Sequence, residues 1–283
     1  MCQFANRYRG VAVRRDCLYN YKVINQGCRS PLFQMGFKTD GSVHYGGVQN
    51  ELDTIDFLNS INRYQQLVEH RGGTGQKADA AAGDKMISIK RKKGIKNGSF
   101  DWCNTSIYND TFKGHFTKFL EDVKEHRQMP KQLREVAVDF MRNDFNNLCE
   151  SALDNIDKQA LINMLVDIFS KQTGYDIVIN DTESKDVYIF EAEAHPVWTA
   201  IKQGYTLELV STGRAKSSRK IVFKNGNHVI NTGLRLRVTS NNGINAFLGL
   251  SKANKNSQVV VKLQQDAVNQ LVKDADAEHY NYA

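Results

Sequence analysis

The chain has 283 residues, of which 41% are hydrophobic and 24% charged, with only 3 prolines and a net charge of +7. This composition is typical of a globular protein that buries a substantial core, and no apolar run approaches the roughly 18 residues that a membrane span requires. The N-terminus has no apolar core after its first charges, so we expect no secretory signal and an intracellular, cytoplasmic location without membrane contact.

The first 45 residues are rich in Gly, Arg and Tyr, and they predict only short strands around Val11–Val13 and Tyr19–Ile24. The 5 cysteines of the chain are odd in number and scattered, which favours reduced thiols over a disulfide framework. A zinc site is an alternative for four residues of this part, although their spacing matches no known pattern: Cys2, Cys17, Cys28 and His44.

The stretch from Gly47 to His70 predicts a helix, because its apolar residues recur at steps of three and four. Glu51 lies beside this apolar stripe and therefore borders the buried face. The glycines that follow Arg71 indicate the end of the helix.

A glycine-rich loop then leads to Asp79, and the run Met86–Lys93 predicts a strand. The residues Ala81–Asp84 supply turn chemistry between them, so we expect a hairpin. Side chains alternate along a strand, so Ser88 and Lys90 share one face while the intervening isoleucines point to the core.

Further elements follow in order along the chain. Apolar periodicity and capping residues predict a strand over 100–108 and then three helices, over 110–127, 130–153 and 158–173. After Gly174 the pattern predicts short strands and one last helix, at 175–180, 187–192, 206–210, 220–223, 234–238, 259–263 and 264–275.

The charges are segregated. Six basic residues and no acid lie between Lys85 and Lys96, and ten basic residues and no acid lie between Leu209 and Gln265. Such positive surfaces are typical of proteins that bind a phosphate backbone. We therefore expect a phosphate backbone to be bound by five residues in these two segments: Arg91, Lys92, Lys93, Arg235 and Arg237.

A helix with a glutamate, a strand that ends in an acid, and a returning strand with a lysine resemble the PD-(D/E)XK nuclease superfamily. The resemblance covers roughly residues 47–127, with Asp79, the triplet Ser88-Ile89-Lys90 and Glu51 at the motif positions. It implies an α/β (α+β) fold with a restriction-endonuclease-like αβββαβ core, a mixed sheet flanked by helices. We expect this core within residues 1–174, and a β-rich basic segment of the same unit at 175–283.

The resemblance also implies a Mg²⁺ site, with Mn²⁺ as a substitute, in which Asp79 and Glu51 hold the metal and Lys90 contacts the attacking water and the phosphate. The sequence departs from the family at Ser88, where the family has a carboxylate. Glu51 is the preferred replacement for the missing acid, and Asp84 in the hairpin turn is the alternative.

Two other motifs compete with this site. Asp186 followed by Glu191 and Glu193 resembles a variant seen in some restriction enzymes, and strand alternation puts Glu191 and Glu193 on one face as a candidate metal pair, but no lysine lies within that motif. The glycines before Lys77 resemble a phosphate-binding loop, but a helix precedes them instead of a strand, and Ala78 replaces the required Ser or Thr.

The sequence thus predicts a Mg²⁺-dependent endonuclease that cleaves double-stranded DNA in the manner of a type II restriction enzyme. Cleavage of both strands requires two active sites, so we expect a homodimer. The alternative is a non-catalytic nucleic-acid-binding protein with a decayed nuclease core, in which Ser88 marks the lost activity.

Overall fold

The computed structural model describes residues 43–71, 78–93, 99–211, 213, 216–240, 243–251 and 257–282. The strands expected near residues 11 and 19, and the cysteines of the zinc alternative, lie outside the described residues. The contacts divide the chain into two units, residues 1–46 and 47–283. The described helices and strands belong to the second unit, apart from the start of the helix α2.

Six strands of the described chain form a mixed sheet, which we call sheet A, in the order β1-β2-β3-β5-β6-β11. All neighbouring strands are antiparallel except β3 and β5, which are parallel. The bounds of these strands are β1 Val68–His70, β2 Ala80–Ala82, β3 Lys85–Lys92, β5 Asp176–Asp181, β6 Asp186–Glu191 and β11 Glu278–Asn281.

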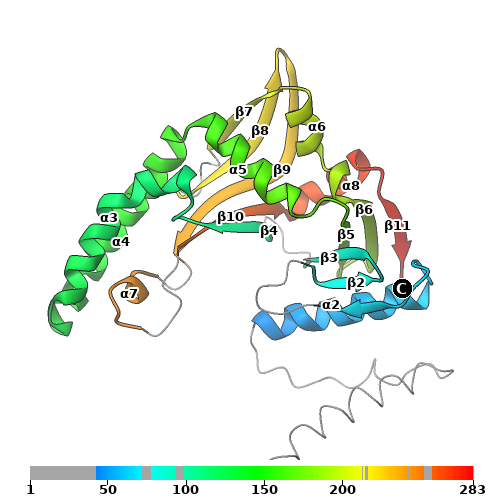
Figure 1. The fold of residues 1–283 in the computed structure, drawn as a ribbon, viewed down its shortest axis with the longest axis horizontal. Helices are drawn as coiled ribbons and strands as arrows, with labels where there is room; N and C mark the ends of the chain where they lie inside the picture. The colour runs from blue at the N-terminus through cyan, green and yellow to red at the C-terminus, as the bar shows by residue number, and fades with distance from the viewer. Residues whose placement is uncertain are drawn as a thin grey trace, which may run out of the picture. The chain divides into compact units, whose positions relative to one another are not determined.

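The helix α2 (Val43–Ser60) covers one face of sheet A, beside β2 and β3 in Figure 1. Ile55 and Leu58 of α2 pack with Ile87 and Ile89 of β3 in one apolar cluster. A buried polar contact accompanies this packing, because the amide of Asn180 on β5 donates to side chains of the helix. The face that carries the isoleucines is therefore buried, as the alternation of β3 predicted.

The helix predicted over 47–70 was too long. It ends at Ser60, and Asn62 adopts a left-handed conformation with φ of 50°, which a helix cannot contain. The side chain of Asn59 then bonds both backbone groups of Val68, at 2.8 and 3.1 Å, and holds the start of β1. The apolar spacing predicted a helix up to His70, but the hydrogen bonds between Asn59 and Val68 hold this part of the chain in a turn and a strand.

The second sheet, sheet B, is antiparallel and has the order β4-β10-β9-β8-β7. The bounds of these strands are β4 Ser99–Ser106, β7 Thr206–Ser211, β8 Ser218–Asn225, β9 His228–Ser240 and β10 Ser257–Gln264. The strand predicted at 100–108 is therefore present, but it belongs to sheet B and not to the hairpin sheet. The structure also contains a short strand between α2 and β2, β1, which the sequence pattern did not predict.

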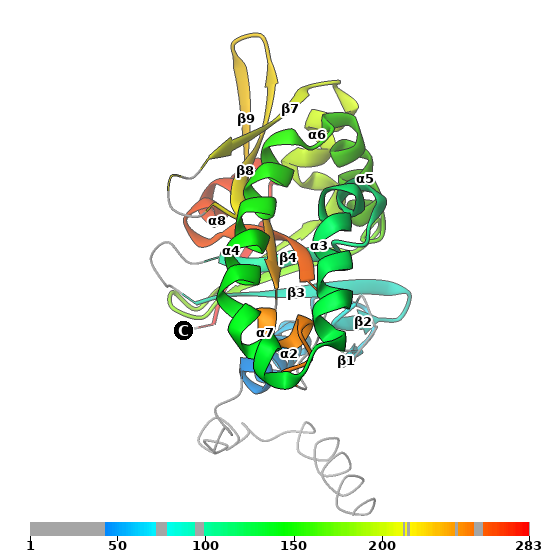
Figure 2. The same ribbon diagram turned by 90° about the vertical axis from the view of Figure 1, so that its left-hand side faces the viewer.

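Three helices pack together with the main apolar cluster: α3 (Asp110–Gln128), α4 (Lys131–Asn155) and α5 (Lys158–Ser170). Figure 2 shows α3 and α4 running side by side, and three phenylalanine rings, Phe116, Phe119 and Phe145, fill the space between them. The buried guanidinium of Arg219 on β8 donates two hydrogen bonds to Asp154 of α4, at 2.7 and 3.0 Å. Sheet B thus has one face covered by helices.

Short helices complete the described fold: α6 (Pro196–Lys202), α7 (Gly243–Phe247) and α8 (Val268–Asp274). The expected boundary at residue 174 does not separate two parts, because β5, β6 and β11 join β3 in sheet A while β7 to β10 join β4 in sheet B. The α/β fold class is confirmed. Within the described residues, no helix combines the length and apolarity needed to cross a membrane.

Candidate active site

The expected hairpin forms between β2 and β3, but Ala81 and Ala82, predicted to lie in the turn, belong to β2, and the turn is at Gly83, where φ is +61°, and Asp84. Asp79 lies just before β2, and its carboxylate oxygen Oδ2 accepts the backbone N–H of Ile89 at 2.7 Å and the hydroxyl of Ser88 at 3.2 Å. Ser88 is buried, with 1% of its surface exposed. The acid and the hydroxyl of the motif are therefore brought together, and the acid also holds the hairpin in register.

Lys90 lies two residues further along β3, so it shares the face of Ser88 and stands opposite Ile179 of β5. This face is the one turned away from α2. The ammonium is near the thiol of Cys103 on β4: burial raises the pKa of that thiol to about 12, and the positive charge of Lys90 partly offsets the increase. Asp79, Ser88 and Lys90 thus line one side of the hairpin.

Glu51 is placed differently from the expectation. Its carboxylate contacts Nε2 of His70 at 2.9 Å, and His70 pairs with Ala80 on β1 and β2. Ala80 in turn pairs with Ile87, so the contact belongs to the face that α2 covers. The structure joins Glu51 to His70, and it records no contact between Glu51 and Asp79 among the described residues.

The basic residues after Lys90 differ in their surroundings. Lys92 is half-buried and forms an ion pair with Asp181 of β5. Lys93 is exposed, while its backbone N–H donates to the side chain of Gln265 at 3.0 Å. Lys92 is therefore engaged within sheet A, and Lys93 is the better placed of the two to meet a phosphate.

A second acid–lysine group lies on the α2 face, at the end of sheet A where the hairpin turns. Lys85 of β3 reaches Asp176 of β5 at 2.7 Å and Glu191 of β6 at 3.8 Å, and the hydroxyl of Tyr64 donates to Asp176 at 2.8 Å. Burial and the negative charge of Asp176 raise the pKa of Tyr64 above its ordinary value. The sequence identified Glu191 but not its partners, because Lys85 and Asp176 come from distant strands.

The Glu191/Glu193 pair predicted from alternation does not form. The strand β6 ends at Glu191, and a turn of 3₁₀-helix over Ala192–Ala194 redirects Glu193, which accepts the backbone N–H of Gly174 at 2.7 Å. Asp186, at the start of β6, bonds instead to His279 and Asn281 of β11. The motif itself contains no lysine, but Lys85 of β3 lies 3.8 Å from Glu191.

We also searched for side chains that together could bind a metal ion. Among the described residues, no group of three or more His, Cys, Asp or Glu side chains is arranged to hold a metal ion. No family model, curated protein or solved structure matches this chain. The candidate site therefore depends on its own geometry.

Sheet B carries basic residues on the face opposite its buried leucines. Arg235 on β9 stands directly between Lys220 on β8 and Lys262 on β10, and Arg237 is exposed two residues further on. Like charges directly opposite each other across strands are destabilising, and an anion relieves that repulsion. Among the described residues, the Asp101 carboxylate lies 2.5 Å from Lys262 and compensates part of this charge.

Proposed function

We propose that the protein is a Mg²⁺-dependent endonuclease that hydrolyses phosphodiester bonds in double-stranded DNA. The observation that carries the proposal is the hairpin on which Asp79, Ser88 and Lys90 share one side. The chain runs α2-β1-β2-β3, then through β4 of sheet B and the helices α3, α4 and α5, to β5, which lies parallel to β3. With β4, α3 and α4 taken as insertions, this order corresponds to the αβββαβ succession that the motif implies, and it supports the proposal.

The donor set on this face fits a Mg²⁺ ion that is completed by the substrate. Asp79 uses Oδ2 for Ile89 and Ser88, and among the described residues no hydrogen bond is donated to its other oxygen, Oδ1. Mg²⁺ commonly binds one or two carboxylates and takes its remaining ligands from water and substrate phosphates. The bound ion would neutralise the scissile phosphate and lower the pKa of a coordinated water.

The protein's own residues then have separate tasks. Asp79 holds the metal, and Lys90 contacts the phosphate and orients the attacking water, since a positive group there stabilises the developing hydroxide. Arg235 and Arg237 bind the flanking backbone. Glu51 contacts His70 on the α2 face, which is opposite to the face of Asp79, so the proposal depends on Asp79 and Lys90.

The test is nicking and linearisation of supercoiled plasmid. The proposal predicts cleavage in Mg²⁺ or Mn²⁺ and none in EDTA, and sedimentation of the DNA-bound protein as a dimer, because cutting both strands takes two sites. Cleavage that persists in EDTA would contradict the metal-dependent mechanism.

A non-catalytic nucleic-acid-binding protein is the second candidate, and one observation favours it. Ser88 is buried at the position where the motif has a carboxylate, and its hydroxyl donates a hydrogen bond to Asp79. A protein with a decayed nuclease core would bind DNA but cleave no sequence in the presence of Mg²⁺ or Mn²⁺. The same plasmid assay therefore separates the two candidates.

A further inference from the structure

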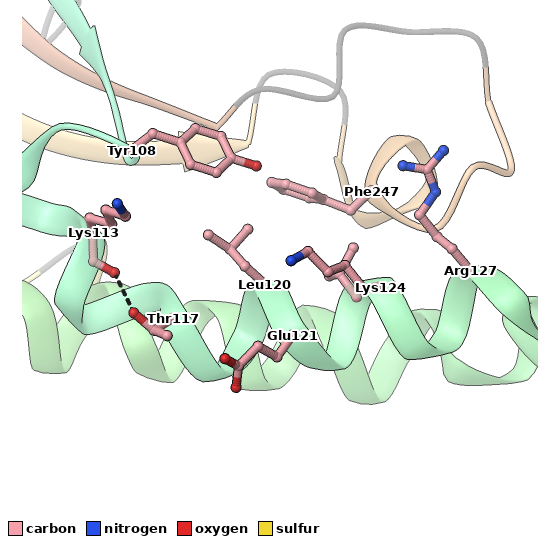
Figure 3. A pocket seen from close by; sticks show the side chains of 9 residues that line it. Tyr108, Lys113, Thr117, Leu120, Glu121, Lys124, Arg127 and Phe247 are labelled. Carbon is pink, nitrogen blue, oxygen red and sulfur yellow. Dashed lines mark hydrogen bonds between the residues drawn. The ribbon is translucent and has the colours of Figure 1, made fainter.

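A groove on the helical side of the protein is separate from the hairpin site. It is an open cavity of about 450 Å³ between α3, α7 and the turn that joins β4 to α3. This volume is within the range of roughly 300–1,000 Å³ that is usual for ligand sites. Figure 3 shows the residues that line it, which include Tyr108, Lys113, Leu120, Lys124, Arg127 and Phe247.

The charge of the groove is positive. Lys113, Lys124 and Arg127 are all exposed residues of one helix, and the first and last are 14 positions apart, or about 21 Å at 1.5 Å per residue. Glu121 is the acid among the lining residues, and Figure 3 shows its carboxylate directed away from the two aromatic rings. An anionic ligand that follows the helix would therefore meet three cations.

The aromatic rings are held in different ways. Phe247 is buried and packs against Phe119 and Phe145, which fixes α7 as a wall of the groove. Tyr108 is 49% exposed, although the neighbouring Ile107 is fully buried and Asn109 caps α3 by accepting the N–H of Thr111. A rigid turn thus presents one ring to the solvent beside a row of cations.

We propose that this groove binds a single-stranded segment of nucleic acid, with a base stacked on Tyr108 and the backbone along Lys113, Lys124 and Arg127. Exposed aromatic rings combined with a positive groove are the common means of binding single strands without sequence preference. A peptide of Asp and Glu would satisfy the cations but has no flat ring to stack on Tyr108, whereas every base of a nucleic acid has one. The proposal goes beyond the cleavage assigned to the hairpin and does not require it.

The test is binding of fluorescein-labelled oligo(dT) of twenty nucleotides, followed by fluorescence anisotropy in EDTA so that no cleavage occurs. It is performed with the full chain carrying Arg235→Ala and Arg237→Ala, because this background removes the expected phosphate contacts of sheet B. Added to it, Lys113→Ala with Lys124→Ala is expected to weaken binding about tenfold and to reduce the slope of log Kd against log salt by about 1.4, or about 0.7 for each lost phosphate contact.

The matched control removes two lysines outside the groove, Lys118→Ala with Lys131→Ala, and is expected to leave affinity and slope within about twofold and 0.3 of the background. Tyr108→Leu is expected to weaken binding about tenfold, whereas Tyr108→Phe retains it, because stacking needs the ring and not the hydroxyl.

Equal weakening by the groove pair and the control pair would overturn the proposal, since only net charge would then matter. So would full competition by poly-glutamate together with an unaffected Tyr108→Leu variant, which would indicate a surface for acidic proteins. Circular dichroism of each variant confirms folding. Loss of plasmid cleavage in the hairpin variants does not affect these measurements, so the two proposals fail independently.

Discussion

Replacing Asp79 separates its structural contribution from its chemical one. In Asp79→Ala the buried N–H of Ile89 loses its acceptor, which costs about 1–3 kcal/mol, and the Ser88 hydroxyl loses a partner worth about 1 kcal/mol. The free energy of unfolding should therefore fall by about 2–4 kcal/mol. In Asp79→Asn the side-chain carbonyl still accepts from Ile89, so the loss should be about 1 kcal/mol.

Urea unfolding followed by circular dichroism measures these differences. Asp84→Ala is the matched control, because Asp84 is an exposed carboxylate in the same hairpin, and a surface substitution there should change stability by no more than about 0.5 kcal/mol. If Asp79→Ala unfolds at the same urea concentration as Asp84→Ala, the hydrogen bonds assigned to Asp79 do not stabilise the hairpin. Asp79→Asn should nevertheless lose plasmid cleavage, because an amide is a poor Mg²⁺ ligand.

Three further results are expected. Arg235→Ala with Arg237→Ala should weaken duplex binding and reduce its salt slope by about 1.8, or about 0.9 for each contact, and an unchanged slope would show that these residues do not touch phosphate. Asp154→Ala should destabilise the protein by about 1–2 kcal/mol, because the buried Arg219 loses two charge-assisted bonds; wild-type stability would contradict this. Burial lowers the pKa of His195 to about 3, so unfolding takes up a proton below the ordinary pKa of about 6.5. The stability from the neutral His195 is therefore complete above pH 6.5 and decreases toward pH 3. His195→Asn keeps a cap for Val197 and should flatten that decrease, and an identical pH profile would rule out His195 as its source.

The local elements were largely predictable from sequence. The helices α3, α4 and α5 follow their apolar spacing and caps, and Asp157 caps α5 by accepting the N–H of Ala160, as the pattern of such residues leads one to expect. The strands β5 to β10 also lie where alternating or apolar runs indicated them. Such features depend on neighbours within about one turn or one strand, which the sequence displays directly.

Which strands pair with one another was not predictable from the sequence. The strand β4 resembles a continuation of the hairpin, yet it pairs with β10, more than one hundred and fifty residues later. Long-range packing determines which sheet a strand joins, and the local sequence pattern of the strand does not contain that information.

The candidate site shows the same limit. The contact of Asp79 with Ser88 follows from a short hairpin, and the sequence predicted the hairpin but not the contact. The ion pairs of Lys85 with Asp176 and of Lys92 with Asp181 arise because β3 lies parallel to a strand about ninety residues away. The contact of Glu51 with His70 depends on the early end of α2, which the spacing of apolar residues does not reveal.

The most direct test of the proposed active site compares Lys90→Ala with Lys85→Ala in Mg²⁺-dependent plasmid cleavage. The two lysines are on the same strand but on opposite faces, so each reports on one acid–lysine group. We expect Lys90→Ala to lose cleavage at least a hundredfold while it binds DNA within a few-fold of wild type, and Lys85→Ala to retain cleavage. Full activity in Lys90→Ala with loss in Lys85→Ala would contradict the assignment and move the chemistry to Asp176 and Glu191.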